Sequence, residues 1–304
     1  MADVSIIIPT HNRPHLLPNA VESARAAGRN TEIIVVDDAS TDETASVCRE
    51  LKGIKYIRLE RNQGVAGARN IGILASSSDY IAFLDDDDLR LPGSLDLQTD
   101  ALDAQRDSGW CCGSMLLADQ SGELTGDVSS PPGSIGGDVF WQLLELDFPV
   151  MPIAVMIRKE CFFRVGLFRP RLAGIDDWDM FVRLAEMYRI VCLDEPVGIY
   201  RAPTPSSAQG SSAQGRHLTR AARHQLQLLK LPRAAEASSS RRREVRLRTV
   251  NRIADTLLWN AARRLPEGAY KFACKNTLAA LRLNPLRALR PMAYKRLCER
   301  LLAN

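Results

Sequence analysis

The 304-residue sequence has no long hydrophobic run. Its longest apolar segment after the first strand-like run, residues 148–157 (FPVMPIAVMI), has ten residues and two prolines, whereas a bilayer-spanning helix needs about 20 apolar residues. The first residues, MADVSIIIPTHNRP, have no basic segment before the apolar one and do not predict a signal peptide. We therefore expect a cytoplasmic protein, either soluble or bound at the inner face of the cytoplasmic membrane.

Two common cysteine patterns and one nucleotide-binding motif are also missing. The seven cysteines are odd in number and include no CxxC pair, which argues against a disulfide framework and against a zinc site. No GxxxxGK[ST] sequence is present, so an NTPase with a phosphate-binding P-loop is disfavoured.

The charge of the chain is divided unevenly along its length. Residues 1–215 contain 19 Lys and Arg against 31 Asp and Glu, while residues 216–304 contain 21 against 5. An acidic first part suggests a cation site or a solvated surface, and a basic tail suggests an anionic partner.

The first hundred residues alternate between strand-like and helix-like patterns. Short β-branched and aromatic runs at 4–8, 32–36, 54–59 and 80–84 predict buried strands, and apolar residues at helical spacing lie between them. This alternation predicts a doubly wound, mostly parallel α/β sheet with its ligand crevice at the carboxyl ends of the strands. The polar segments PTHNR, DDAST and DDDD would then meet at one edge.

The rest of the chain is less regular. Residues 109–200 mix strand and helix patterns, and the segment 203–215 (PTPSSAQGSSAQG) predicts a flexible linker. Beyond it, amphipathic patterns predict an α-helical appendage whose third helix begins at Asn284–Pro285.

Four consecutive aspartates, Asp85–Asp88, follow the fourth predicted strand. An EF-hand is excluded because its required Gly and Glu positions are occupied by Arg90 and Asp96. One aspartate could cap a helix beginning near Leu89, but a cap needs only one carboxylate. A cluster of hard oxygen ligands is better explained by Mg²⁺ or Mn²⁺ held together with substrate phosphates.

These motifs, in this order, resemble glycosyltransferase family 2. The resemblance spans about residues 3–201 and rests on VSIIIPTHNR, EIIVVDDASTDET, NQGVAGARNIGILASSSDYIAFLDDDD and DDWDMFVRLA. It implies the GT-A nucleotide-diphospho-sugar transferase fold, with a nucleotide-binding half over 1–108 and an acceptor half over 109–202. It also implies inverting, metal-dependent transfer of a sugar.

The resemblance further implies roles for individual residues. The residues that would hold the base and ribose are Pro9, Thr10, Asn12 and Asp38. Those that would complete the nucleotide pocket are Asn62, Gly64 and Arg69. Asp85 and Asp86 would lie near the ribose and the water ligands of the metal, and Asp87 would bind the metal directly.

Simpler interpretations exist for three of these residues. Asp38 could cap the helix that follows STDE, and Gly64 could serve turn geometry alone. Arg69 could form a surface ion pair, although an arginine at the start of a helix suits a diphosphate pocket.

A second acidic pair, Asp176–Asp177, matches the family's catalytic carboxylates. Inverting transfer needs a base that takes the proton of the acceptor hydroxyl, and we assign this role to Asp177 with Asp176 as its orienting neighbour. The alternative is that one of the pair caps the helix while Asp179 pairs with Arg183 four residues later.

The basic tail of residues 216–304 allows several partners. It contains no recognisable nucleic-acid module, so we expect no nucleic-acid partner. Peripheral contact with an anionic membrane and a scaffold or dimer role both stay open. We predict a glycosyltransferase that uses a nucleotide sugar, with a UDP-sugar favoured, and an acceptor hydroxyl on a lipid-linked or cell-envelope glycan. The alternative is a nucleotide-sugar-binding or scaffold protein that has lost catalysis.

Overall fold

The computed structural model describes residues 3–131, 136–148, 150–172, 174–203, 224–264, 268 and 270–288. Most of the predicted linker 203–215 lies outside these residues. The chain divides into two compact units, one of Met1–Leu143 and Phe148–Ala202 and the other of Leu144–Asp147 and Pro203–Asn304.

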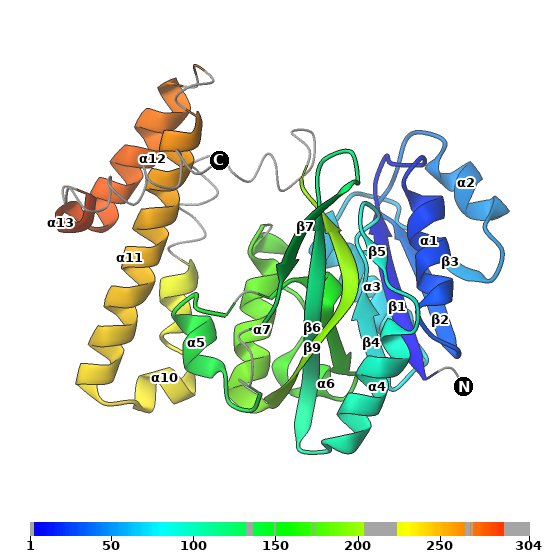
Figure 1. Cartoon of the computed structure of the whole chain (residues 1–304), viewed down its shortest axis with the longest axis horizontal. Coiled ribbons are helices and arrows are strands. Elements are labelled where there is room, and N and C mark those ends of the chain that lie inside the picture. Colours follow the sequence, from blue (N-terminus) through cyan, green and yellow to red (C-terminus); the bar gives the residue numbers. More distant parts are fainter. Residues whose placement is uncertain are drawn as a thin grey trace. The chain divides into compact units, whose positions relative to one another are not determined.

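The first unit contains a mixed sheet that has nine strands in the part of the chain described (Figure 1). Its order is β3-β2-β1-β4-β8-β6-β9-β5, with β7 also paired to β6. The strands are β1 Val4–Thr10, β2 Thr31–Asp37, β3 Ile54–Arg58, β4 Tyr80–Phe83, β5 Leu89–Arg90, β6 Ser108–Ala118, β7 Leu124–Ser129, β8 Val155–Arg158 and β9 Arg189–Arg201.

The helices of this unit connect the strands. They are α1 Leu17–Ala26, α2 Thr44–Glu50, α3 Gly64–Ala75, α4 Ser94–Ala104, α5 Phe140–Leu144, α6 Cys161–Val165 and α7 Asp176–Met187, with 3₁₀ turns at Pro152–Ala154 and Pro170–Leu172. The last residue of α5, Leu144, belongs to the second unit.

The predicted α/β architecture is confirmed. Strands β1 to β4 are parallel, while β8 runs antiparallel to both β4 and β6, so the parallel arrangement holds for the first half and becomes mixed beyond it. The carboxyl ends of β1, β2 and β4 therefore lie along one edge, which is where the polar segments leave the sheet.

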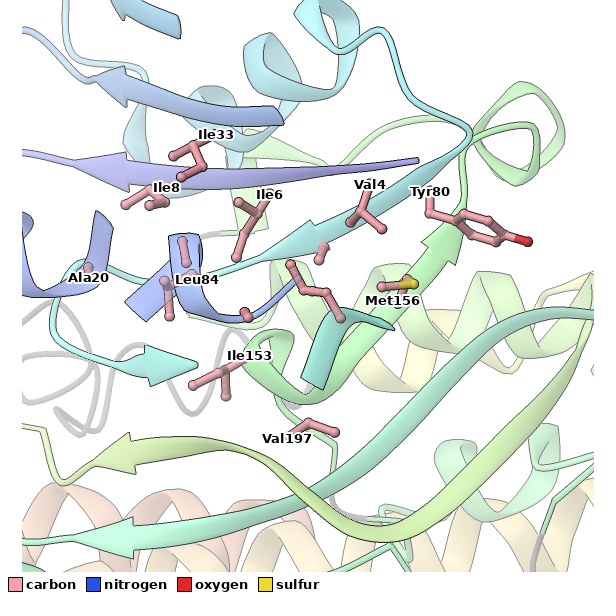
Figure 2. Close-up of a cluster of buried hydrophobic side chains, with 14 of the residues drawn as sticks. Val4, Ile6, Ile8, Ala20, Ile33, Tyr80, Leu84, Ile153, Met156 and Val197 are labelled. Atoms are coloured by element: carbon pink, nitrogen blue, oxygen red, sulfur yellow. The ribbon is translucent and has the colours of Figure 1, made fainter. Parts of the chain in front are cut away.

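Alternate residues of β1 bury on opposite faces of the sheet. Ile6 and Ile8 belong to a core cluster with Leu17 and Ala20 of α1 and with residues of the antiparallel strands (Figure 2). On the other face, Ile7 lies against Gly72 of α3. Because a strand presents successive side chains to opposite faces, β1 packs against a helix on each face of the sheet.

The alternative interpretation of a capped helix beginning near Leu89 is wrong. Leu89–Arg90 forms β5 against β9, and the next helix, α4, starts at Ser94 after Gly93 in a left-handed conformation (φ 72°). The buried Arg90 side chain donates to Gln98 Oε1 at 2.7 Å and to the Phe83 carbonyl at 3.3 Å. The acidic loop is therefore followed by a strand anchored by a buried arginine, and its aspartates cap no helix at that point.

The second unit consists of helices in its described part. They are α10 Pro232–Glu236, α11 Ser239–Arg264, α12 Tyr270–Leu283 and α13 Pro285–Ala288. Leu257 and Leu258 of α11 bury with Ala280 of α12, which joins the two longest helices through an apolar seam. The third predicted helix start, at Asn284–Pro285, is confirmed by α13.

Segment Leu144–Asp147 is held by α11 through several polar contacts. Glu145 pairs with Arg248 at 2.8 Å and with Arg241 at 3.2 Å, and Thr249 donates to the Leu144 carbonyl at 2.9 Å. Part of the basic charge of α11 is therefore already neutralised inside the unit. Among the described residues, no helix is long and apolar enough to cross a membrane.

Replacing Gly72 by alanine will lower the free energy of unfolding by about 1–3 kcal/mol, because a Cβ at this position would overlap the side chain of Ile7 in a packed core. Urea unfolding measures the change. Leu74→Ala on the same helix is the control, since Leu74 is 66% exposed and its loss should change stability by less than about 0.5 kcal/mol. Equal stability of Gly72→Ala and wild type would contradict the assigned packing.

Candidate active site

Four hydrogen bonds link the loops that follow β1 and β2 and the segment at the start of α3. Asn12 is in a left-handed conformation (φ 54°); its backbone N–H donates to Ser40 Oγ at 2.9 Å, and its Oδ1 accepts from Thr41 N at 2.8 Å. The Asp38 carboxylate accepts from Gln63 N at 2.6 Å and from Gly64 N at 2.8 Å. The predicted nucleotide residues from three separate segments are thus brought together.

Asp38 therefore has a structural role at a helix other than the one considered from the sequence. It receives the first amides of α3, whereas Asp42 accepts from Thr44 N at 3.0 Å at the start of α2. Asn62 completes this turn, with its amide donating to the Asp38 carbonyl at 3.3 Å and its Oδ1 accepting from Gly64 N at 3.1 Å. Gly64 has φ 75°, a left-handed conformation that a residue with a Cβ adopts at a cost. Pro9 lies inside the sheet, in register with Val36.

The acidic loop is neutralised in part by Arg13 from the end of β1. Arg13 Nη1 donates to Asp86 Oδ1 at 2.8 Å and to Asp87 Oδ2 at 2.9 Å. Thr10 Oγ1 donates to the other oxygen of Asp86 at 2.7 Å. Burial raises the pKa of Asp86 to about 6, against the opposing effect of Arg13 and Thr10, and burial likewise raises the pKa of Asp87.

Arg69 links the acidic loop to the second acidic pair. Its Nη2 donates to Asp85 Oδ1 at 2.6 Å and its Nη1 to Asp176 Oδ2 at 3.4 Å. The guanidinium carbon lies 6.0 Å from the ring centre of Phe83 and 5.7 Å from that of Phe168. Arg69 is therefore a buried bridge between two carboxylate groups, and the surface ion pair considered from the sequence is wrong.

Asp176 and Asp177 have different surroundings at the start of α7. Asp176 is buried, pairs with Arg69 and accepts from Gly174 N at 3.2 Å. Asp177 is partly exposed and accepts from Trp178 N at 2.7 Å. Burial raises the pKa of both carboxyls, with Arg69 opposing the rise. Asp177 thus has the greater access to a substrate.

The helix-capping alternative for this pair receives no support, because the N-cap residue of α7 is Ile175. The second part of that alternative, the Asp179–Arg183 ion pair, is confirmed. Asp179 pairs with Arg183 at 2.8 Å and also with Arg169 at 2.9 Å. That buried carboxylate is occupied by structural arginines, which leaves Asp176 and Asp177 as the acidic pair at the sheet edge.

Three residues near the site were not assigned from the sequence. Arg13 follows Asn12 in the polar segment PTHNR at the end of β1. Its place in that segment is the sequence feature that could have identified it as a site residue. Asp88 is buried and accepts from the backbone N–H of Arg201 at 2.9 Å, which ties the end of β9 to the acidic loop. Burial, followed by the charges of Asp88, Asp85, Asp87 and Asp177, raises the pKa of the Tyr200 phenol.

Asp86 and Asp87 suit a divalent cation. One oxygen of each carboxylate already faces the same cationic nitrogen of Arg13, so the two oxygens converge on one point. Within the described residues, no three His, Cys, Asp or Glu side chains are arranged to hold a metal ion. A cation here would therefore need further ligands from water and from a substrate, as is common for Mg²⁺.

Comparison with known proteins agrees with this fold. The model of glycosyl transferase family 2 matches residues 5–145. The resemblance inferred from the motifs is therefore confirmed, and this region is a glycosyltransferase family 2 domain.

The chain is also similar to individual proteins. It is 34% identical over 132 residues to the UDP-Glc:alpha-D-GlcNAc-diphosphoundecaprenol beta-1,3-glucosyltransferase WfaP of Escherichia coli, covering 42% of this chain and 52% of that protein. Uncharacterized glycosyltransferases of Rickettsia also match, and this chain spans 26 to 33% of their length.

Two solved structures share the fold over most of the chain. One is S. aureus TarS 1–349 in complex with UDP-GlcNAc, with a TM-score of 0.57, 14% identity, and coverage of 92% of this chain and 91% of that one. The other is the mannosyltransferase PcManGT from Pyrobaculum calidifontis in complex with GDP-Man and Mn²⁺, with a TM-score of 0.56, 18% identity, and coverage of 93% and 87%. The GT-A-like fold is thereby confirmed.

Proposed function

We propose that this chain is a metal-dependent inverting glycosyltransferase that moves a sugar from a UDP-linked donor to a hydroxyl of a lipid-linked or cell-envelope glycan. The observation that carries the proposal is the meeting of two carboxylate groups, Asp85–Asp88 and Asp176–Asp177, at the edge where the predicted nucleotide residues gather. One group suits the donor diphosphate with its cation, and the other suits the acceptor. The name of the E. coli relative, which includes both UDP-Glc and a diphosphoundecaprenol, supports the choice of donor and acceptor.

In this proposal the donor lies along the ends of β1 and β2. Pro9, Thr10, Asn12 and Asp38 would lie beside the base and ribose. Asn62 and Gly64 would complete the pocket through the turn that they form with Asp38. Asp87, with Asp86 beside it, would hold Mg²⁺ or Mn²⁺. When bound, the cation would neutralise the charge that develops on the departing diphosphate.

Asp177 is the proposed general base. Its partly exposed carboxylate would accept the proton of the acceptor hydroxyl while that oxygen attacks the anomeric carbon from the face opposite the leaving diphosphate. Asp176 would orient Asp177, because it is the adjacent residue in the first turn of α7 and its carboxylate is held in place by Arg69. Arg69, bound to Asp85 as well, would keep the acceptor base at a defined place relative to the donor.

Calorimetric titration of UDP tests the donor site. We expect binding with Mn²⁺, at least about tenfold weaker binding with EDTA, and a similar loss in Asp87→Asn, because the cation would link the carboxylate to the diphosphate. Asp107→Asn is the control, since Asp107 is 69% exposed and pairs with Arg189. Binding of GDP in place of UDP would change the donor assignment, and binding that ignores both EDTA and Asp87 would reject the metal site.

Asp177→Asn will reduce the transfer rate by about 10²–10⁴-fold while UDP binding is retained, because an amide cannot accept the proton. In the wild type, kcat/KM will fall as the pH decreases through about 6, the value to which burial raises the pKa of Asp176, since the coupled pair must be ionised to act as base. Transfer and donor hydrolysis are measured over pH 5–9. A wild type that binds UDP-sugar but catalyses neither reaction would favour the alternative, a nucleotide-sugar-binding or scaffold protein.

Peripheral contact of α12 with an anionic membrane is part of the proposal. Tyr270 and Leu278 are 70% and 47% exposed, Lys271 and Lys275 are exposed between them, and α12 contains no acidic residue. Apolar and basic side chains on one exposed helix face are typical of helices that lie in a lipid interface.

Lys271→Glu/Lys275→Glu will weaken binding to phosphatidylglycerol vesicles by about tenfold or more, because each lysine near an anionic surface contributes about 1 kcal/mol. Cosedimentation measures the binding, and neutral phosphatidylcholine vesicles serve as the lipid control. Lys52→Glu, a change of an exposed lysine in the other unit, should bind like the wild type. Equal binding of the double variant and the wild type would reject the α12 surface.

A further inference from the structure

Two arginines neutralise the acidic loop, and their environments differ. Arg69 is 4% exposed, lies near the Phe83 and Phe168 rings and pairs with carboxylates from two elements. Arg13 is 27% exposed, follows the end of β1, and uses a single nitrogen for both of its acidic partners. Removing Arg69 from its place would leave buried charges without a partner, whereas the Arg13 side chain can turn toward solvent.

We propose, resting on the function proposed above, that Arg13 is an exchangeable counter-ion of the cation site. Its guanidinium and the divalent cation compete for the same oxygens of Asp86 and Asp87, and the cation releases Arg13 to bind the donor diphosphate.

The competition follows from the geometry of the shared oxygens. Asp86 Oδ1 and Asp87 Oδ2 lie 2.8 and 2.9 Å from Arg13 Nη1, and the second oxygen of Asp86 is taken by Thr10. A cation bound to Asp86 Oδ1 and Asp87 Oδ2 would occupy the place of Arg13 Nη1. The cation and the guanidinium would repel each other strongly if both stayed beside these oxygens. Arg13 therefore leaves when the cation enters.

The second step follows from charge and reach. Once released, Arg13 still stands on the loop after β1, beside the proposed nucleotide residues Thr10 and Asn12. A guanidinium presents paired N–H donors that match phosphate oxygens. Asp86 and Asp87 retain a positive partner throughout, first from the arginine and then from the cation, while the arginine charge becomes available to the diphosphate.

Arg13→Gln will have opposite effects on two binding reactions. We expect Mn²⁺ alone to bind roughly three- to tenfold more tightly than in the wild type, because no arginine has to be displaced. We expect UDP in the presence of saturating Mn²⁺ to bind roughly tenfold more weakly, because a charge-assisted contact to the diphosphate is lost. Electron paramagnetic resonance of free Mn²⁺ measures the first and calorimetry the second.

Two further variants serve as controls. Arg13→Lys keeps the positive charge and should bind Mn²⁺ alone with an affinity close to that of the wild type. Arg29→Gln removes an arginine that is 87% exposed and pairs with Asp96, and it should leave both reactions unchanged. Thermal unfolding of each variant checks that the fold is retained, and a gain of Mn²⁺ affinity cannot arise from a damaged site.

The outcomes separate this proposal from the proposed function. If Arg13→Gln binds Mn²⁺ alone no more tightly than the wild type, while UDP binding still depends on Mn²⁺ and Asp87, the exchange is rejected and the metal-dependent donor site stands. If Mn²⁺ binds tightly in the variant but UDP affinity is unchanged, the release of Arg13 to the diphosphate is rejected. If the wild type binds neither Mn²⁺ nor UDP, both proposals fail.

Discussion

The buried guanidinium of Arg69 is the interaction on which the rest of the site depends. Its side chain is 4% exposed and pairs with Asp85 from the loop after β4 and with Asp176 from α7. Asp176 is 107 positions away from Arg69 in the sequence. A buried charge is tolerated only where opposite charges and hydrogen bonds compensate its lost hydration. The two acidic groups must therefore lie within reach of one side chain, and that requirement holds the loop after β4 and the start of α7 together.

The sheet topology makes this meeting of charges achievable. β1 lies between β2 and β4, with parallel pairing on both sides, so three loops leave the sheet at neighbouring carboxyl ends. On the far side of β4 the antiparallel β8 begins the second half of the sheet, which continues through β6 and β9. Arg201, at the end of β9, reaches back to Asp88 through its backbone N–H. The acidic loop is consequently bounded by both halves of the sheet.

Local sequence patterns predicted the first half of the fold well, because the apolar pattern of a buried strand or an amphipathic helix can be recognised within a few consecutive residues. The β1, β2, β3 and β4 runs, and the gathering of polar segments at their ends, were all expected from such patterns. The contacts of Arg13 and Arg69 were not, since the charge partner of a side chain is chosen by tertiary placement over 16 to 107 residues. The alternative of a helix beginning near Leu89 was wrong, because pairing with β9 and burial of Arg90 outweigh local capping signals. The family roles of the site residues came from resemblance and stay predictions.

The acidic loop lowers the stability of the folded protein at neutral pH. Burial raises the pKa of Asp86, Asp87 and Asp88, which means that the folded state holds their protons more tightly than the unfolded chain does. Such groups contribute most to stability at low pH, and that contribution is lost as the pH rises through the folded-state pKa. At neutral pH the ionised cluster therefore opposes folding, and Arg13 offsets the effect at Asp86 and Asp87 only in part. A cation that binds the folded protein alone would stabilise it in proportion to its affinity, so the same charges that weaken the fold would strengthen the binding of their ligand.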